Sequence, residues 1–140
     1  MQVTKLDHVN VHTANLDAMV AWYGRVLGMR AGERPPFPFP GAWLYCGDEP
    51  VVHLVGVDEQ PEKPGKLPQL EHFAFSAKGL EEFVGRLQSD KVRYEARKVP
   101  RSGSVQVNIW DPDGNHIHVD FAPEESAGFE LQEVSSGGMR

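Results

Sequence analysis

The chain has 140 residues, of which 40% are hydrophobic and 24% charged, so it has the size and composition of one globular domain with a substantial core. Its net charge of −6 argues against a nucleic-acid partner, because phosphate binding depends on a basic surface. We expect a cytoplasmic protein, because no apolar stretch is long enough to span a bilayer and the N-terminus lacks an export leader. The single cysteine, Cys46, fits a reducing compartment, and we expect its small side chain in the core rather than in the alternative, catalytic role.

The first half of the chain predicts a strand, a helix and three further strands. Val9 and Val11 alternate with polar residues, which is the pattern of a strand with one covered face. Asn15 suits the start of the following helix and Gly28 suits its end. Residues 34–41 include four prolines and predict a stiff loop. The expected strands cover residues 5–12, 29–34, 42–46 and 51–57, and the expected helix covers 16–27.

The second half repeats this plan after a proline-containing link over residues 58–68. Asp111-Pro112-Asp113-Gly114 is a strong turn signal before the last strand. The tail over residues 122–140 is rich in Gly, Ser and Glu, and we expect it either to be poorly ordered or to pack late in folding. The expected strands cover residues 70–76, 92–98, 105–110 and 116–121, and the expected helix covers 80–89.

Two motifs recur at nearly constant spacing. Leu6-Asp7-His8-Val9 returns 64 residues later as Leu70-Glu71-His72-Phe73, and Val52-His53-Leu54 returns 65 residues later as Ile117-His118-Val119. Self-similarity of this kind indicates a duplicated supersecondary unit. The predicted fold class is therefore α+β, within one domain over residues 1–140. Two βαβββ modules, at about 5–57 and 69–121, form a curved mixed eight-stranded sheet with helices on its convex face and a concave face open for a site.

All six histidines fall on the polar face of the predicted strands. Four of them occupy repeat-related positions: His8, His53, His72 and His118. Converging imidazoles repel one another when protonated, and a divalent metal that binds their lone pairs removes this repulsion. The alternative is that the duplication copied histidines that serve packing or face solvent. We favour a divalent metal site, with Fe, Mn, Zn, Ni or Co as the candidate ions.

These motifs resemble the vicinal oxygen chelate superfamily, which includes glyoxalase I, methylmalonyl-CoA epimerase, extradiol dioxygenases, fosfomycin resistance enzymes and bleomycin-binding proteins. The resemblance covers residues 5 to about 121. It rests on the two Leu-acid-His strands, on the helix end at 22–29 and on the segment at 111–118. It implies metal ligands from the first and last strands of each module: His8, His53, His72 and His118. It also favours a homodimer in which each site takes two ligands from each chain, although a single chain could complete the cavity.

One departure from the family pattern affects the chemistry. His118 stands where the family usually has a glutamate that serves the isomerases as a metal-bound base. Asp120 lies two residues further on the same face. It is our candidate catalytic residue, as the base, as a partner of a ligand or as an unusual ligand, and the alternative is a solvated edge residue.

Several polar and aromatic residues on the same face are candidate substrate contacts: Asn10, Trp43, Gln106, Asn108 and Trp110. They could instead satisfy backbone groups or belong to the core. The leading hypothesis is a metal-dependent enzyme whose small substrate chelates the ion through adjacent oxygens. Lyase or isomerase chemistry and ring-cleaving dioxygenase chemistry both stay open. The second hypothesis is a metal-free protein that sequesters an aromatic drug, with Phe37 and Phe39 adding to an apolar wall.

Overall fold

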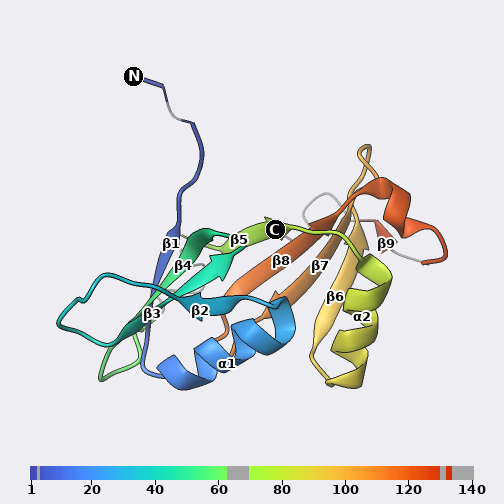
Figure 1. Cartoon of the computed structure of the whole chain (residues 1–140). Coiled ribbons are helices and arrows are strands. Elements are labelled where there is room, and N and C mark those ends of the chain that lie inside the picture. The colour runs from blue at the N-terminus through green and yellow to red at the C-terminus, as the bar shows by residue number, and fades with distance from the viewer. Residues whose placement is uncertain (3, 63–69, 130–131, 134–140) are drawn as a thin grey trace. The chain divides into compact units, whose positions relative to one another are not determined.

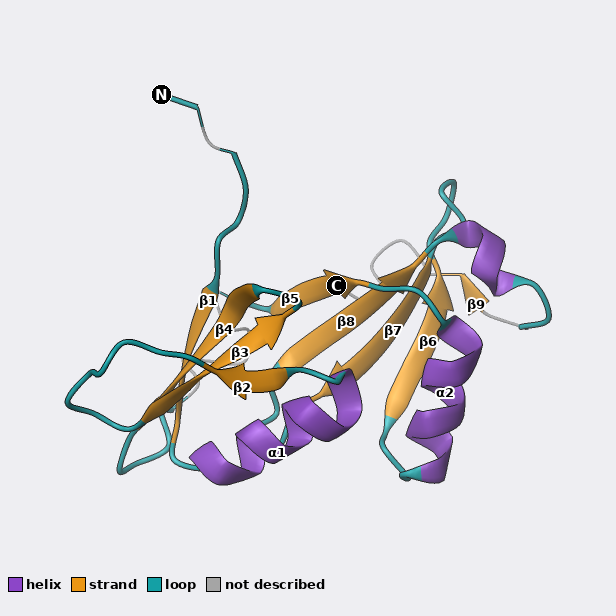
Figure 2. Cartoon of the chain, in the orientation of Figure 1, coloured by secondary structure: helices purple, strands orange, loops and turns teal. Residues whose placement is uncertain are grey.

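The computed structural model describes residues 1–2, 4–62, 70–129 and 132–133, and it divides into two compact units, Met1–Lys63 and Pro64–Arg140. Each unit contains one α-helix and one mixed sheet (Figures 1 and 2). This arrangement confirms the predicted α+β class with two βαβββ modules. Neither α-helix in the described ranges has the length and apolar character needed to cross a membrane.

The first unit has the five elements that the sequence predicts. They are β1 (Val9–Thr13), α1 (Leu16–Leu27), β2 (Arg30–Gly32), β3 (Gly41–Cys46) and β4 (Glu49–Gly56). The sheet order is β1-β4-β3-β2, with β1 parallel to β4 and the other pairs antiparallel. The first strand starts at Val9 rather than at residue 5, so His8 lies just before it.

Helix α1 covers the apolar face of this sheet and packs against β2, β3 and β4. Its buried residues recur at helical spacing, and the strand residues of the core lie on alternate positions: Met19, Trp22, Tyr23 and Val26 on the helix, and Leu44, Val52 and Leu54 on the strands. Gly28 ends the helix as predicted, with a φ of 68° that favours glycine. Apolar packing therefore fixes one face of β4 and leaves His53 to the other.

Cys46 is exposed, so the expectation of a buried cysteine is wrong. It is the last residue of β3 and precedes the turn at Gly47, whose φ is 60°. The chain leaves the sheet at this point and turns into β4. Cysteine composition alone carries no information about this position.

The second unit repeats the plan and adds to it. Its elements are β5 (His72–Ser76), α2 (Leu80–Ser89), β6 (Tyr94–Lys98), β7 (Val105–Trp110), β8 (His116–Phe121), a 3₁₀-helix (Pro123–Ser126) and β9 (Gln132–Glu133). The sheet order is β5-β8-β7-β6-β9, with β5 parallel to β8 and β9 parallel to β6. Helix α2 contributes its predicted apolar face to the core, where Leu80, Val84 and Leu87 are buried.

The described part of the tail, over residues 122–129 and 132–133, packs against the rest of the second unit. The Glu125 carboxylate accepts the backbone N–H groups of Gly79 and Leu80, at 2.8 and 3.0 Å, and so caps α2. Strand β9 pairs with β6 through backbone groups. Both contacts join segments distant in sequence, which composition does not reveal. The expectations for residues 63–69, 130–131 and 134–140 lie outside the described residues.

The predicted turn before β8 is present. The Asp111 carboxylate accepts the backbone N–H groups of Asp113 and Asn115 at 3.0 and 2.8 Å, and Gly114 has a φ of 82°. The turn brings the chain back antiparallel to β7, and β8 begins at His116. The short segment after Gly114 therefore sets the register of both histidines on β8.

Candidate functional site

The polar face of the first sheet carries three of the predicted site residues. His53 on β4 lies opposite Asn10 on β1 and opposite Trp43 on β3. Residues opposite one another on adjacent strands share a face of the sheet. These three residues therefore share one face of the sheet, and Val52 and Leu54 face the core.

His53 lies between two other rings. Its centroid is 3.9 Å from that of His8 and 4.0 Å from that of Trp43, and both ring pairs are within 11° of parallel. His8 Nδ1 donates to Asp7 Oδ2 at 2.6 Å, and His53 Nε2 donates to the Pro50 carbonyl at 2.9 Å. When neutral, each histidine in this arrangement keeps one lone pair, at Nε2 of His8 and at Nδ1 of His53.

The polar face of the second sheet holds the other predicted site residues. Three cross-strand rows run over β5, β8 and β7, and they consist of His72, His116 and Trp110; Ala74, His118 and Asn108; and Ser76, Asp120 and Gln106. His118 is 6% exposed and Asn108 is fully buried. This face therefore carries mainly polar side chains, of which His118 and Asn108 are buried.

Two histidines of this face have the same hydrogen-bond arrangement. His118 Nδ1 donates to Asp120 Oδ1 at 2.6 Å, and His72 Nδ1 donates to the Glu71 carboxylate. Their ring centroids lie 4.5 Å apart with planes inclined by 47°. Each neutral ring then has its lone pair at Nε2, away from the carboxylate.

Glu71 and His116 belong to this cluster, and sequence reasoning gave neither of them a role. Glu71 accepts from His72 and also from His116 Nδ1, the latter at 3.0 Å. One possible ligand atom from each of Glu71, His72 and His116 lies within 4.8 Å of the others. Burial raises the pKa of Glu71, but the hydrogen bonds from His72 and His116 outweigh it, so the pKa lies below its ordinary value.

In the sequence, the acidic residue directly before each repeated histidine indicates this carboxylate–histidine arrangement. Asp7 bonds to His8, and Glu71 bonds to His72. The hydrogen bond from His8 holds the pKa of Asp7 below its ordinary value. The repeated motif is therefore a carboxylate–imidazole pair rather than a histidine alone.

These side chains fit a divalent transition metal. Histidines that ligate metals usually donate their other ring N–H to a carboxylate or carbonyl, and His8, His53, His72 and His118 all do so. Imidazole nitrogen suits Zn, Fe, Ni and Cu. A metal ion bound by a histidine lies in the plane of the imidazole ring. The ring planes of His8 and His53 are nearly parallel and do not meet near either ring, so one ion can bind both residues only if the His8 ring rotates. His8 lies before β1 with 39% of its side chain exposed, which leaves room for this rotation.

The candidate substrate residues of the second unit differ in accessibility. Gln106 and Trp110 are partly exposed, whereas Asn108 is buried. The Asn108 side-chain amide donates to the Glu95 carbonyl at 3.2 Å, and its oxygen accepts from His116 Nε2 at 2.8 Å. Asn108 is thus engaged with protein groups at both ends of its amide.

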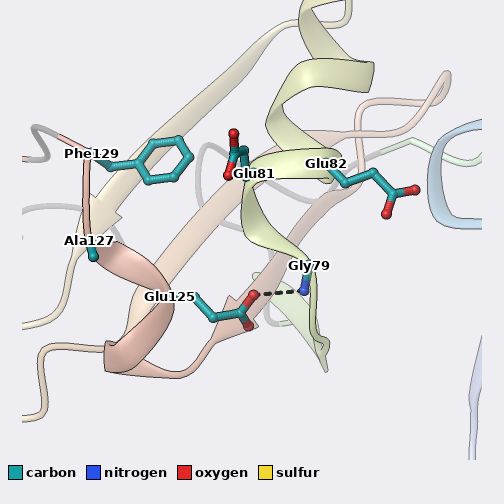
Figure 3. Close-up of a pocket in the computed structure, with 6 residues that line it drawn as sticks. All are labelled: Gly79, Glu81, Glu82, Glu125, Ala127 and Phe129. Atoms are coloured by element: carbon teal, nitrogen blue, oxygen red, sulfur yellow. Dashed lines mark hydrogen bonds between the residues drawn. The ribbon is translucent and has the colours of Figure 1, made fainter.

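A hollow of about 600 Å³ lies elsewhere in the second unit, beside the start of α2 (Figure 3). Its lining residues are Gly79, Glu81, Glu82, Glu125, Ala127 and Phe129. Figure 3 shows the Glu125 carboxylate reaching the Gly79 nitrogen, which is the helix cap described above. None of these residues is among the predicted site residues, and we assign the hollow no role in the chemistry.

Burial lowers the pKa of His53, and the bond to the Pro50 carbonyl opposes this shift only in part. The unfolded chain, with a histidine pKa of about 6.5, therefore binds protons more readily than the folded chain. We predict that the free energy of unfolding of metal-free protein falls as the pH drops below about 6.5, and that His53→Gln makes this dependence shallower. Urea unfolding at pH 7.5, 6.5 and 5.5 measures both slopes, and equal slopes would contradict the prediction.

Comparison with known proteins adds the following findings. Residues 5–119 match the family described as the Glyoxalase/Bleomycin resistance protein/Dioxygenase superfamily. A protein of Arabidopsis thaliana named Glyoxylase I 4 is 29% identical over 126 residues, which cover 85% of this chain and 71% of that protein. Lactoylglutathione lyase from Agrobacterium tumefaciens shares the fold with a TM-score of 0.67 and 23% identity, over 92% of this chain and 100% of the other. A glyoxylase/bleomycin resistance protein/dioxygenase domain from Frankia sp. EAN1pec has a TM-score of 0.70 and 16% identity, over 86% and 99%.

Proposed function

Because this chain belongs to the Glyoxalase/Bleomycin resistance protein/Dioxygenase superfamily, we propose that it is a metal-dependent enzyme that acts on a small substrate with adjacent oxygen atoms. The observation that carries the proposal is the set of three histidines, His8, His72 and His118, whose Nδ1 atoms are all bound by carboxylates. This arrangement selects the tautomer of each ring and leaves Nε2 available to an ion. His53 is the fourth proposed ligand.

In this proposal protein carboxylates orient the histidine ligands, and a carboxylate accepts the proton that the substrate loses. A bound divalent ion supplies a Lewis acid that polarises the substrate oxygens. Asp120 holds His118 through Oδ1, and its side chain is 37% exposed, so Oδ2 is our candidate for a general base. All four proposed ligands are neutral, so the site has no carboxylate ligand to act as base.

The substrate is proposed to contact the polar faces of the two sheets beside these histidines. Asn10 and Trp43 flank His53, and Gln106 and Trp110 flank the β8 residues Asp120 and His116. The two tryptophans offer flat apolar surfaces, and the two amides offer hydrogen bonds. Asn108 contributes indirectly, because its amide is already bound to protein groups.

We propose lyase or isomerase chemistry ahead of dioxygenase chemistry. The name of the Arabidopsis relative, Glyoxylase I 4, supports this order. A dioxygenase would require a redox-active ion with open coordination positions. A site with three or four imidazole ligands is also compatible with such an ion. We also propose that the protein acts in the cytoplasm as a homodimer in which His8 and His53 of one chain share an ion with His72 and His118 of the other.

A second candidate function is the metal-free sequestration of an aromatic drug. One observation favours it: Phe37 and Phe39 are each 42% exposed, and their rings stack with centroids 5.1 Å apart. The Arg34 guanidinium lies 5.2 Å from both ring centroids, and Phe37 lies 6.4 Å from Trp43. Such an aromatic surface could bind a flat ligand without any metal.

Thermal unfolding separates the two candidates. Divalent metal at 100 times its dissociation constant should stabilise the fold by about 2.7 kcal/mol, which for a chain of this length raises the melting temperature by about 10 °C. A chelator should reverse the increase, and it should vanish below pH ~6 because protons compete for the imidazoles. Coincident melting curves with metal and with chelator at pH 7.5 would rule out the metal-dependent function and leave sequestration as the explanation.

A further inference from the structure

We infer that His116 is a positioning residue for the proposed metal site, because it holds Glu71 in the orientation that fixes the ring of His72. The inference rests on the proposed function and adds a residue to it. The contacts form one series, from Asn108 through His116 and Glu71 to His72, and they cross strands β7, β8 and β5.

Glu71 divides its two carboxylate oxygens between two rings. Oε2 accepts from His72 Nδ1, and Oε1 accepts from His116 Nδ1 at 3.0 Å. Glu71 lies one residue before the start of β5, outside the paired strand. A carboxylate held at both oxygens has little freedom to rotate. His116 therefore restricts the atom that selects the His72 tautomer with its lone pair at Nε2.

His116 is itself held firmly. Its side chain is 9% exposed and its Nε2 lies 2.8 Å from Asn108 Oδ1, so the imidazolium form of His116 donates to Asn108 and to Glu71 at once. The bond from the Asn108 amide to the Glu95 carbonyl turns the amide oxygen toward His116. The Trp110 ring stacks on His116, with centroids 5.4 Å apart and planes inclined by 15°. These contacts make His116 a rigid support rather than a mobile ligand.

The first unit provides an internal comparison. Its corresponding pair, Asp7 and His8, has no counterpart of His116, since the position 65 residues earlier is Val51. The Asp7 side chain is 77% exposed, against 32% for Glu71. The orientation of the Glu71–His72 pair should therefore depend on His116, whereas the Asp7–His8 pair has no equivalent residue on which to depend.

A double-mutant cycle on metal affinity tests the inference. The variants are Glu71→Gln, His116→Gln and the combination of both, with the exposed His12→Gln as the matched control. Glutamine at 116 cannot donate to both Asn108 and Glu71, and His116→Phe keeps the stack on Trp110 as a second variant. The dissociation constant for Zn²⁺ is measured by competition with a chromophoric chelator. Melting curves without metal verify folding, and the Co²⁺ absorption spectrum reports the ligand set.

We expect Glu71→Gln to weaken Zn²⁺ binding by about 10–100-fold and His116→Gln by about tenfold. The double variant should bind no more weakly than Glu71→Gln alone, because His116 acts through Glu71. The Co²⁺ bands should keep their positions in every variant, since the ligands do not change.

The inference is overturned if His116→Gln and His116→Phe both bind Zn²⁺ within about twofold of the unaltered protein, or if the two effects multiply in the double variant. Shifted Co²⁺ bands in Glu71→Gln would also overturn it, because Glu71 would then be a direct ligand. If the unaltered protein binds neither ion, the proposed function fails and this inference fails with it. Normal binding with unaffected His116 variants removes only the inference.

Discussion

Alanine in place of His72 or His118 is expected to weaken divalent metal binding by more than about 100-fold. Loss of a carboxylate that supports a ligand costs about 10–100-fold, and removal of the ligand itself should cost more. Both histidines are held by a carboxylate in the second unit, and their rings lie 4.5 Å apart. Competition titration with Zn²⁺ as the probe measures the dissociation constant of each variant.

His12→Ala is the matched control, because His12 is an exposed histidine on β1 to which we assign no role. It should bind Zn²⁺ like the unaltered protein. Melting curves recorded without metal establish that each variant is folded before its affinity is compared. Equal affinities for His72→Ala, His118→Ala and His12→Ala, all folded, would remove these histidines from the site.

The second large effect concerns the shared site of the proposed homodimer. His8→Ala protein and His72→Ala protein should each lack tight metal binding. After subunit exchange, every mixed dimer contains one site without substitutions and one with both. Random exchange at equal amounts should therefore restore about one quarter of the binding capacity of the unaltered protein. Equilibrium dialysis of the mixture against Zn²⁺ measures the recovered capacity.

Exchange itself must be demonstrated independently, for example by mass spectrometry of differently tagged subunits. A mixture of two His72→Ala preparations serves as the control and should recover nothing. No recovery in the test mixture, despite proven exchange, would place all four histidines of a site within one chain. The proposed metal ligands would then stand, and the shared dimeric site would not.

The sequence predicts the fold well because the duplication is visible in it. The helix over 80–89 matches α2 residue for residue, and Gly28 and the turn at 111–114 end their elements where expected. These features depend on local backbone preferences, which short motifs encode. The 3₁₀-helix and β9 were missed because they are held by contacts with residues more than 30 positions away, such as Glu125 with Gly79.

Only part of the candidate site can be predicted from the sequence. Strand alternation predicts that Asn10 and His53 lie on the polar face, and the cross-strand register places Trp43 beside them. The hydrogen bonds of Asp7 to His8 and of Glu71 to His72 can be recognised only from the side-chain positions, although both acid–histidine pairs are visible in the sequence repeat. His116 was overlooked because its partners, Asn108 and Glu71, come from two other segments of the chain. Only the register of three strands brings these residues together.

Elemental analysis of the protein, purified without a metal-affinity tag, is the most direct test of whether these histidines hold a metal ion. We predict about one equivalent of Fe, Mn, Zn, Ni or Co per chain, retained through dialysis at neutral pH and released on acidification as the imidazoles take up protons. A folded preparation with less than about one tenth of an equivalent, which also fails to take up added metal, would contradict it.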